Sequence, residues 1–486
     1  MQGNNLLRKG LFLRPWGTVV FLACLLLLLV AGCLGTDVRD APRASMPPPP
    51  ELGVKDGLVH VFLQLKNENP QGSWMRLSSV ALVGNERIVA LPLGASEFSA
   101  NELGGGQRFV ARGAAPEGTY RFLRLTVEKA ALERNGNKLL LALPAPVVDL
   151  PLENGFQLVA GESISLFLTW DEENSLSNKA IFAPAMDAGI QKQPLLADLA
   201  YVSCPEIDTV FMVRTDKNWV CGSIAIPGAP TYMAYASERK KLYVLAQKQS
   251  EIYVVKAATS QVLDRIKIPM TVKPTYFLSK DGRWGYVLDQ EGDYLLKIDL
   301  LQGSMDQRVR LGYKPSYLAW LDGVEQLAIS SGLSQTVYLI DPESLVTRDS
   351  LAVGNTPEGL LAADNYLYVA ESAANTLSIY DLRSRQIVNR INVGFRPMRL
   401  AQGENRIYLS NQLDGTVSLF VPRQQRLVRD IRVGGSPLEM AVANRHKWLY
   451  VAEQATGKVA VIDQGSNRVE GHVDLGAKPL HLLVVP

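Results

Sequence analysis

The sequence has almost no net charge and few side chains suited to metal or redox chemistry. Its 486 residues include 50 Lys and Arg against 48 Asp and Glu, with only four Cys and four His. The near-neutral balance argues against a dedicated nucleic-acid binder, which is normally clearly basic. The scarcity of Cys and His, with no Cys-x-x-Cys spacing, argues against iron–sulfur clusters, multihaem chains and zinc modules. We therefore expect no metal ion and no other cofactor.

What is present at the N-terminus is an export signal. Arg8, Lys9 and Arg14 precede an apolar run from Thr18 to Val30. The following Val30-Ala31-Gly32-Cys33 resembles a bacterial lipobox, which implies that residues 1–32 are a lipoprotein signal peptide and that Cys33 carries the lipid. The alternative is a transmembrane anchor, but the run of about 15 residues is shorter than the roughly 20 that span a bilayer.

The residues after the lipobox bear on localisation. Leu34 occupies the position where enterobacterial lipoproteins kept at the inner membrane have Asp. The resemblance therefore favours the outer membrane and leaves open whether the protein faces the periplasm or the cell surface. Residues 33–56 are rich in proline, which favours extended structure, so we expect a semi-rigid tether. Cleavage before Cys33 leaves 47 basic against 48 acidic residues.

Residues 57–196 show the short alternating apolar segments of an all-β domain, such as residues 59–63 and 163–168. Trp74-Met75-Arg76-Leu77 and Ala160-Gly161-Glu162-Ser163 fall in an order that resembles a secreted bacterial β-sandwich of unknown function, the DUF4382 type. The resemblance implies no catalytic set. His60 lies inside a predicted strand and is expected to be structural.

Residues 197–486 are organised by a repeat of about 40 residues. Seven prolines recur in register: Pro230, Pro274, Pro315, Pro357, Pro397, Pro437 and Pro479. The third residue after each is apolar: Met233, Phe277, Leu318, Leu360, Leu400, Met440 and Leu482. A second series, usually Tyr-Val, marks another strand: Tyr201, Tyr243, Tyr286, Leu327, Tyr368, Tyr408 and Tyr450. Four strands in each repeat predict a propeller blade, in which the proline begins the innermost strand.

This pattern resembles the YVTN (YncE-like) β-propeller family, although Tyr368-Val369-Ala370-Glu371 departs from the Tyr-Val-Thr-Asn consensus. The first repeat lacks a proline-led strand, and the segment from Pro479 is such a strand with nothing after it. We therefore predict an all-β protein: an N-terminal β-sandwich and a seven-bladed propeller closed by the C-terminal strand.

One face of the predicted propeller gathers polar residues. The links into the innermost strands and the hairpins between the second and third strands share this face, and loop faces commonly bind ligands. The candidate ligand face comprises Asp289, Glu371, Asn411, Glu453, Lys273, Lys314, Arg396 and Lys478. A solvated loop face of mixed charge is the alternative interpretation.

Two other functions are considered. A propeller lyase that uses a His base is the family precedent for an enzyme, but only His481 falls near the candidate face, while His446 and His472 fall elsewhere. We therefore predict a protein that is not an enzyme and has no catalytic residues. Arginines on the predicted outer strands, which point to phosphate binding or to protection of strand edges, are Arg383, Arg385, Arg390, Arg423, Arg426, Arg429 and Arg432. They lack the interleaved aromatics that stack on bases, so nucleic acid is disfavoured.

The sequence thus predicts a non-catalytic binding or protein-interaction scaffold of the cell envelope. It would hold the membrane through the lipid on Cys33 and bind an envelope protein, peptide or glycan through its loop face. Enzyme and nucleic-acid binder remain the alternatives. Cys204 and Cys221 are predicted not to pair, because two strands separate them.

Overall fold

The computed structural model describes residues 46–67, 69–134, 137–178, 180–191, 198–269, 272–312 and 314–485. The predicted signal peptide 1–32, the lipidation site Cys33 and most of the tether lie outside the described residues, as does the side chain of Arg423. Residues 46–486 form one compact unit. Within the described residues, no helix is both long and apolar enough to cross a membrane.

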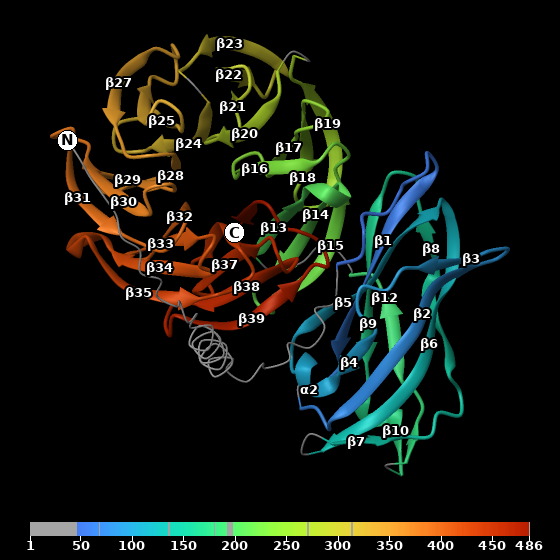
Figure 1. Cartoon of the computed structure of the whole chain (residues 1–486). Helices are drawn as coiled ribbons and strands as arrows, with labels where there is room; N and C mark the ends of the chain where they lie inside the picture. The colour runs from blue at the N-terminus through green and yellow to red at the C-terminus, as the bar shows by residue number, and fades with distance from the viewer. Residues whose placement is uncertain are drawn as a thin grey trace, which may run out of the picture. The chain divides into compact units, whose positions relative to one another are not determined.

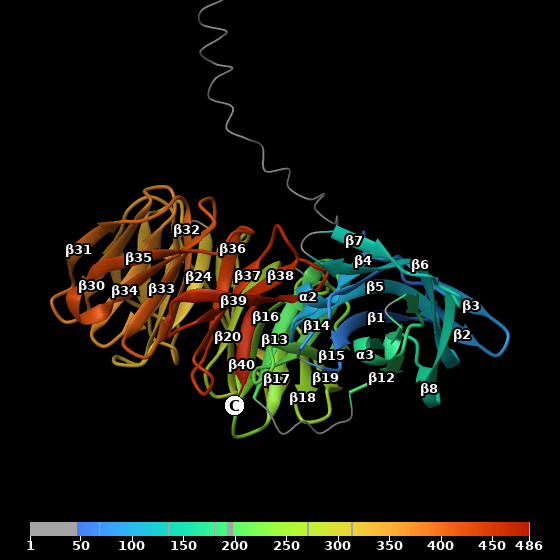
Figure 2. The same cartoon turned by 90° about the horizontal axis from the view of Figure 1, so that it is seen from below.

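The first part of this unit has two main sheets that pack face to face. One has the order β12 (Met186–Gly189), β9 (Ser163–Trp170), β1 (Asp56–Leu65) and β5 (Gln107–Pro116). The other contains β3 (Ile88–Leu91), β2 (Ser73–Gly84), β6 (Gly118–Arg134) and β7 (Asn137–Leu140), with β4 (Glu97–Ser99) beside β2 and β8 (Val147–Leu158) beside β6. The short elements are α2 (Ala100–Leu103), α3 (Glu172–Ser175), β10 (Leu176–Ser177) and β11 (Ile181–Phe182). Figure 2 shows β1 and β5 in one layer and β2 and β6 in the other.

Strand β1 is buried on both of its faces. Val59, Val61 and Leu63 point into the core between the two sheets. His60 and Phe62 point the other way, where both rings contact Phe211 of β14 (Thr209–Arg214). Because alternate residues of a strand face opposite sides, this two-sided burial explains why polar His60 is enclosed although its neighbours form an ordinary apolar strand.

Seven four-stranded antiparallel sheets follow in the described residues, and we number them 1 to 7. Sheet 1 contains β13 (Leu199–Cys204), β14, β15 (Trp219–Ala225) and β40 (Leu482–Val485). Sheets 2 to 4 are β16 (Pro230–Ala236), β17 (Lys241–Ala246), β18 (Glu251–Lys256), β19 (Gln261–Lys267); β20 (Pro274–Ser279), β21 (Trp284–Asp289), β22 (Tyr294–Asp299), β23 (Ser304–Arg310); and β24 (Pro315–Leu321), β25 (Gln326–Ser331), β26 (Thr336–Ile340), β27 (Thr347–Ala352).

Sheets 5 to 7 are β28 (Pro357–Ala363), β29 (Tyr366–Glu371), β30 (Thr376–Asp381), β31 (Gln386–Asn392); β32 (Pro397–Gly403), β33 (Arg406–Asn411), β34 (Thr416–Val421), β35 (Arg426–Arg432); and β36 (Pro437–Ala443), β37 (Trp448–Glu453), β38 (Lys458–Asp463), β39 (Arg468–Asp474). Two 3-10 turns, η1 (Pro205–Ile207) and η2 (Pro422–Gln424), complete the elements. The fold is all-β and propeller-like, and Figure 1 shows the first strands of the sheets toward the middle with the fourth strands outside.

Each proline-led strand has a bulge directly after its proline, for example between Pro230 and Met233, where pairing with β17 resumes. The same irregularity follows Pro357 and Pro397. A bulge redirects the side chains beside it. The apolar third residue therefore returns to the sheet, while the second residue turns toward the inner side.

Neighbouring sheets are joined by their inner strands and by tyrosines. Each inner strand contacts the next, and β40 contacts both β36 and β16. Residues Leu199–Val202 of β13 pair with β40, which is the predicted pairing of the C-terminal strand with the first repeat. The hydroxyl of Tyr243 in sheet 2 donates to Gly282 O before sheet 3's second strand, and Tyr450 in sheet 7 bonds Asn218 of sheet 1. The repeated tyrosine therefore stabilises contacts between sheets.

The sandwich and the propeller-like part share a hydrophobic cluster in which Phe62 and Phe109 pack with Phe211 and Val202. Polar contacts reinforce this junction. The Gln107 side chain accepts a hydrogen bond from Val220 N at 3.0 Å and donates to Val220 O at 3.3 Å. The junction is therefore a packed and hydrogen-bonded interface.

Two residues that we assigned to the tether also contact this junction. Buried Arg112 donates to Pro47 O at 3.1 Å and to Gly476 O at 3.0 Å. Met46 lies against Gly457, where an added Cβ would come within 2.4 Å of the Met46 sulfur. The end of the predicted tether is thus held on the folded part well before β1 begins.

Candidate functional site

We define the loop face as the side formed by the links into the inner strands and the turns between second and third strands. Its four predicted basic residues are exposed. Lys273 pairs with Glu291, and Lys478 pairs with Glu206 at 2.8 Å. For Lys314 and Arg396, no side-chain ion pair occurs within the described part of the chain. These two cations are therefore available to a partner.

The other four predicted residues of the ligand face are buried, contrary to our expectation of a solvent-facing rim. Asp289, Glu371, Asn411 and Glu453 are each no more than 2% exposed. They end the second strands and turn inward beneath the loops. Asp289 accepts from Gly292 N at 2.9 Å, and the Glu371 carboxylate accepts from Gly354 N and from the Ser378 hydroxyl, both at 2.7 Å. These side chains satisfy turn N–H groups and position the loops.

The structure instead gathers a polar ring that the sequence pattern alone did not lead us to expect. The second residue after each repeat proline lies at this ring: Tyr232, Tyr276, Tyr317, Gly359, Arg399, Glu439 and His481. These residues are about 40 positions apart in the chain. The predicted face was built from the residue before each proline and the predicted core from the third residue after it. The signal for the ring was therefore present in the sequence, at the repeat position next to the predicted core residue.

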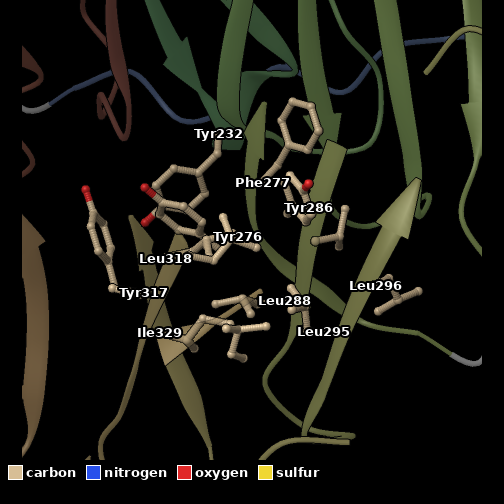
Figure 3. Close-up of a cluster of buried hydrophobic side chains, with 14 of the residues drawn as sticks. Tyr232, Tyr276, Phe277, Tyr286, Leu288, Leu295, Leu296, Tyr317, Leu318 and Ile329 are labelled. Carbon is tan, nitrogen blue, oxygen red and sulfur yellow. The ribbon is translucent and has the colours of Figure 1, made fainter. Parts of the chain in front are cut away.

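Three tyrosines form one arc of the ring. The ring centroids of Tyr232 and Tyr276 are 4.0 Å apart, and those of Tyr276 and Tyr317 are 4.6 Å apart. Figure 3 shows Tyr232 lying against Tyr276, with Tyr317 beside them. His481 contacts Tyr232 at 5.1 Å between centroids. Burial raises the pKa of Tyr232 to about 12, so its hydroxyl is neutral at physiological pH.

Charged residues complete the ring. Arg399 Nε donates to Glu439 Oε1 at 2.9 Å, and its Nη1 lies 3.3 Å from Glu358 Oε2. The guanidinium also lies 4.5 Å from the centre of the Tyr317 ring, within the range of cation–π attraction. Burial raises the pKa of Glu439, and Arg399 opposes that change. The ring's charges are thus compensated within the ring itself.

Gly359 occupies the one ring position without a side chain because the backbone of β32 approaches it closely. An added Cβ would lie 2.3 Å from Met398 O and 3.0 Å from Arg399 Cα. No side chain fits against a backbone carbonyl at that distance. The glycine therefore allows Arg399 and its strand to reach the centre.

The ring and the junction each contain a histidine that is kept neutral. Burial lowers the pKa of His481 to about 3, and its Nδ1 accepts a hydrogen bond from Met233 N at 3.3 Å. Burial also lowers the pKa of His60 well below its usual value, with Nε2 lying 3.1 Å from the Ser163 hydroxyl. Neither imidazole can be protonated without losing these favourable surroundings.

We therefore expect stability to fall as the pH drops below about 6.5, the pKa of an unfolded histidine. Between that value and the depressed folded pKa, the unfolded state binds more protons, so each buried histidine removes up to about 1.4 kcal/mol per pH unit. Urea unfolding at pH 7.5 and pH 5.0 measures this slope. His481→Asn should make it shallower than in the wild type, whereas His446→Asn, in a turn, should not. Equal slopes in wild type and His481→Asn would contradict the interpretation.

The remaining predicted groups are distributed as follows. His472 lies on β39, an outer strand, as predicted, 3.2 Å from Glu453. Cys204 and Cys221 are both free and buried, so the predicted lack of pairing is confirmed. On the outer strands, Arg390 contacts buried Glu371 and Arg385 pairs with Asp349. Part of this arginine stretch is therefore engaged within the protein.

Cavities lie away from the ring. One of about 970 Å³ is at the junction, between Phe156, Ile164, Arg214 and Trp219. Another of about 440 Å³ lies on the side opposite the loop face and is lined by Trp284, Tyr286 and Trp320. Among the described residues, no cluster of three or more His, Cys, Asp or Glu side chains is arranged to hold a metal ion.

These features define the chain's class as an all-β, propeller-like protein with an attached β-sandwich. Similar solved structures include a functionally unknown protein from Desulfotomaculum acetoxidans, with a TM-score of 0.53 and 14% identity over 59% of this chain and 99% of that one. A candidate 6-phosphogluconolactonase from Bacteroides fragilis has a TM-score of 0.52 and 14% identity over 60% of this chain and all of that one. At this identity the likeness concerns the fold alone.

A virginiamycin B lyase from Staphylococcus aureus is also similar, with a TM-score of 0.46 and 11% identity over 53% of this chain and 88% of that one. No protein-family model matches the sequence. No curated protein matches it either.

Proposed function

We propose that this protein is an exported, lipid-anchored and non-catalytic binding scaffold of the bacterial envelope, with its loop face as the recognition surface. The propeller-like part would be a seven-bladed ring of the YVTN type closed by the C-terminal strand. The outer membrane is the favoured location, and an envelope protein, peptide or glycan is the expected class of partner.

One observation carries the proposal. The polar side chains of the centre bond to one another, whereas Lys314 and Arg396 on the loop face are exposed without a side-chain ion pair among the described residues. Binding energy is gained where polar groups still lack protein partners. The loop face is therefore the better candidate for recognition than the ring.

The rigid junction supports the scaffold part of the proposal. Gln107 and Arg112 of the sandwich are buried against backbone groups of the propeller-like part. A buried interface with satisfied polar groups disfavours free movement of the two parts. The loop face would thus be presented in a fixed orientation relative to the sandwich.

The anchor is tested by the mass of the mature N-terminus and by metabolic labelling with a radioactive fatty acid. We expect label on the wild-type chain, and its loss in Cys33→Ala together with accumulation of the uncleaved precursor. Cys24→Ala, within the apolar run, is the matched control and should retain the label. An unlabelled wild-type chain, or a labelled Cys33→Ala chain, would refute lipid anchoring at this residue.

A further inference from the structure

Three large apolar side chains project from the loop face. Leu333, Phe395 and Leu413 are 64%, 62% and 70% exposed, which makes them the most exposed large hydrophobic residues described in sheets 1 to 7. Leu333 lies in the turn between β25 and β26, Leu413 in the turn between β33 and β34, and Phe395 in the link into β32. All three belong to sheets 4 and 6.

Phe395 and Leu413 form one tip of this surface. Leu413 N donates to Phe395 O at 3.2 Å, and the Asp414 carboxylate accepts from Phe395 N at 2.6 Å. Leu333 forms a second tip, and the turn of sheet 5 between them presents exposed Ala373 and Ala374. Isolated projecting side chains of this kind suit a deformable apolar medium better than a rigid flat partner.

Each tip stands beside one of the two available cations. Gly332 N donates to Lys314 O at 3.3 Å, and Gln412 N donates to Arg396 O at 3.0 Å. Among the described residues in the turns and links of sheets 4 to 6, the only charged side chains are Lys314, Arg396 and Asp414. An apolar tip with an adjacent Lys or Arg matches a lipid surface, where the apolar group enters the interface and the cation stays at the phosphates.

The chain also approaches this face from its proposed anchor. Met46 lies against Gly457 in the turn between β37 and β38, which belongs to the loop face of sheet 7. Thirteen residues separate Met46 from Cys33. A segment of that length reaches about 45 Å at most, so lipid on Cys33 would keep Met46 and its face within that distance of the bilayer.

We propose that the loop face of sheets 4 to 6 docks on an anionic lipid surface. Leu333, Phe395 and Leu413 enter the interfacial region, and Lys314 and Arg396 contact lipid phosphates. The inference rests on the loop face being the recognition surface and names the partner of this sector. It does not depend on lipidation, because the contacts are made by the folded part itself.

The test uses the mature chain from residue 33 with Cys33→Ser, which carries no lipid. It is mixed with vesicles of phosphatidylcholine containing 30% phosphatidylglycerol and separated by flotation. We expect binding to these vesicles, at least a tenfold loss of affinity in Leu333→Ser/Phe395→Ser/Leu413→Ser, and about a fivefold loss for each of Lys314→Gln and Arg396→Gln. The two charge variants should lose mainly the preference over vesicles of phosphatidylcholine alone.

The control is Leu301→Ser/Val324→Ser/Val346→Ser, whose residues are 45 to 51% exposed in turns on the opposite face. It should bind like the wild type, and thermal melting should be unchanged in both triple variants, because all six residues are exposed. No binding by the Cys33→Ser chain, or an equal loss in both triple variants, would overturn the docking proposal. Fatty-acid labelling of Cys33 is scored separately, so a labelled chain that fails to bind vesicles refutes docking alone, and an unlabelled chain that binds them refutes anchoring alone.

Discussion

Removal of residues 479–486 is expected to lower the melting temperature by at least 10 °C. The segment contains β40, which pairs with β13, and buried Leu482 and Val485. Each buried aliphatic side chain contributes about 1.5–3 kcal/mol and each ladder hydrogen bond about 1 kcal/mol, so the total exceeds about 5 kcal/mol. For a domain of 150–250 residues, 1 kcal/mol corresponds to about 2–4 °C. The truncated chain would also expose the edge of β13, which favours aggregation.

Differential scanning calorimetry measures this effect. A synthetic peptide of residues 479–486, added in excess to the truncated chain, should restore part of the lost melting temperature, because binding to the folded state alone stabilises it. A scrambled peptide of the same composition should not. An unchanged melting curve after truncation would refute closure by the C-terminal strand.

Arg399→Leu is expected to cost about 3–5 kcal/mol of unfolding free energy, because it leaves a buried carboxylate without its partner. Arg399 is 6% exposed and Glu439 is 4% exposed, with 2.9 Å between Nε and Oε1. Arg399→Leu/Glu439→Leu should recover a large part of the loss, since it removes both buried charges. The exposed Arg396→Leu, three residues earlier in the same link, should change the unfolding free energy by less than about 0.5 kcal/mol.

The pH dependence of the same variant distinguishes charge from packing. Burial already raises the pKa of Glu439 above its unfolded value of 4.5, and the loss of Arg399 removes the group that opposes this. A carboxyl with a raised folded pKa stabilises the fold fully below its unfolded pKa and loses that contribution as the pH rises through the folded pKa. The deficit of Arg399→Leu in urea unfolding should therefore be larger at pH 7.5 than at pH 5. A deficit independent of pH would indicate lost packing instead.

Much of the fold was predictable because its signals are local. The repeat prolines begin the inner strands of sheets 2 to 7, since proline is tolerated at a strand's first residue, where no ladder donor is needed. The pairing of the C-terminal segment with β13 followed from the phase of the repeats. Both features depend on spacing along the chain.

The candidate site was predicted only in part. Lys314 and Arg396 are exposed as expected, but Glu371 and Asn411 are enclosed beneath their loops. The sequence places all four at loop positions and says nothing of side-chain direction at a strand end. That direction is set by which turn N–H and hydroxyl groups lie within reach, as Gly354 N and Ser378 Oγ do for Glu371.

By itself, the sequence determined the all-β architecture, the repeat and the strand boundaries, because alternation and proline spacing are properties of short segments. Only the tertiary structure decided that Tyr232, Arg399, Glu439 and His481 meet at one centre, and that the sandwich shares a core with sheet 1. The reason is geometric. Residues of separate repeats come together only when the sheets pack beside one another, and the bulge after each proline turns one side chain per repeat toward that centre.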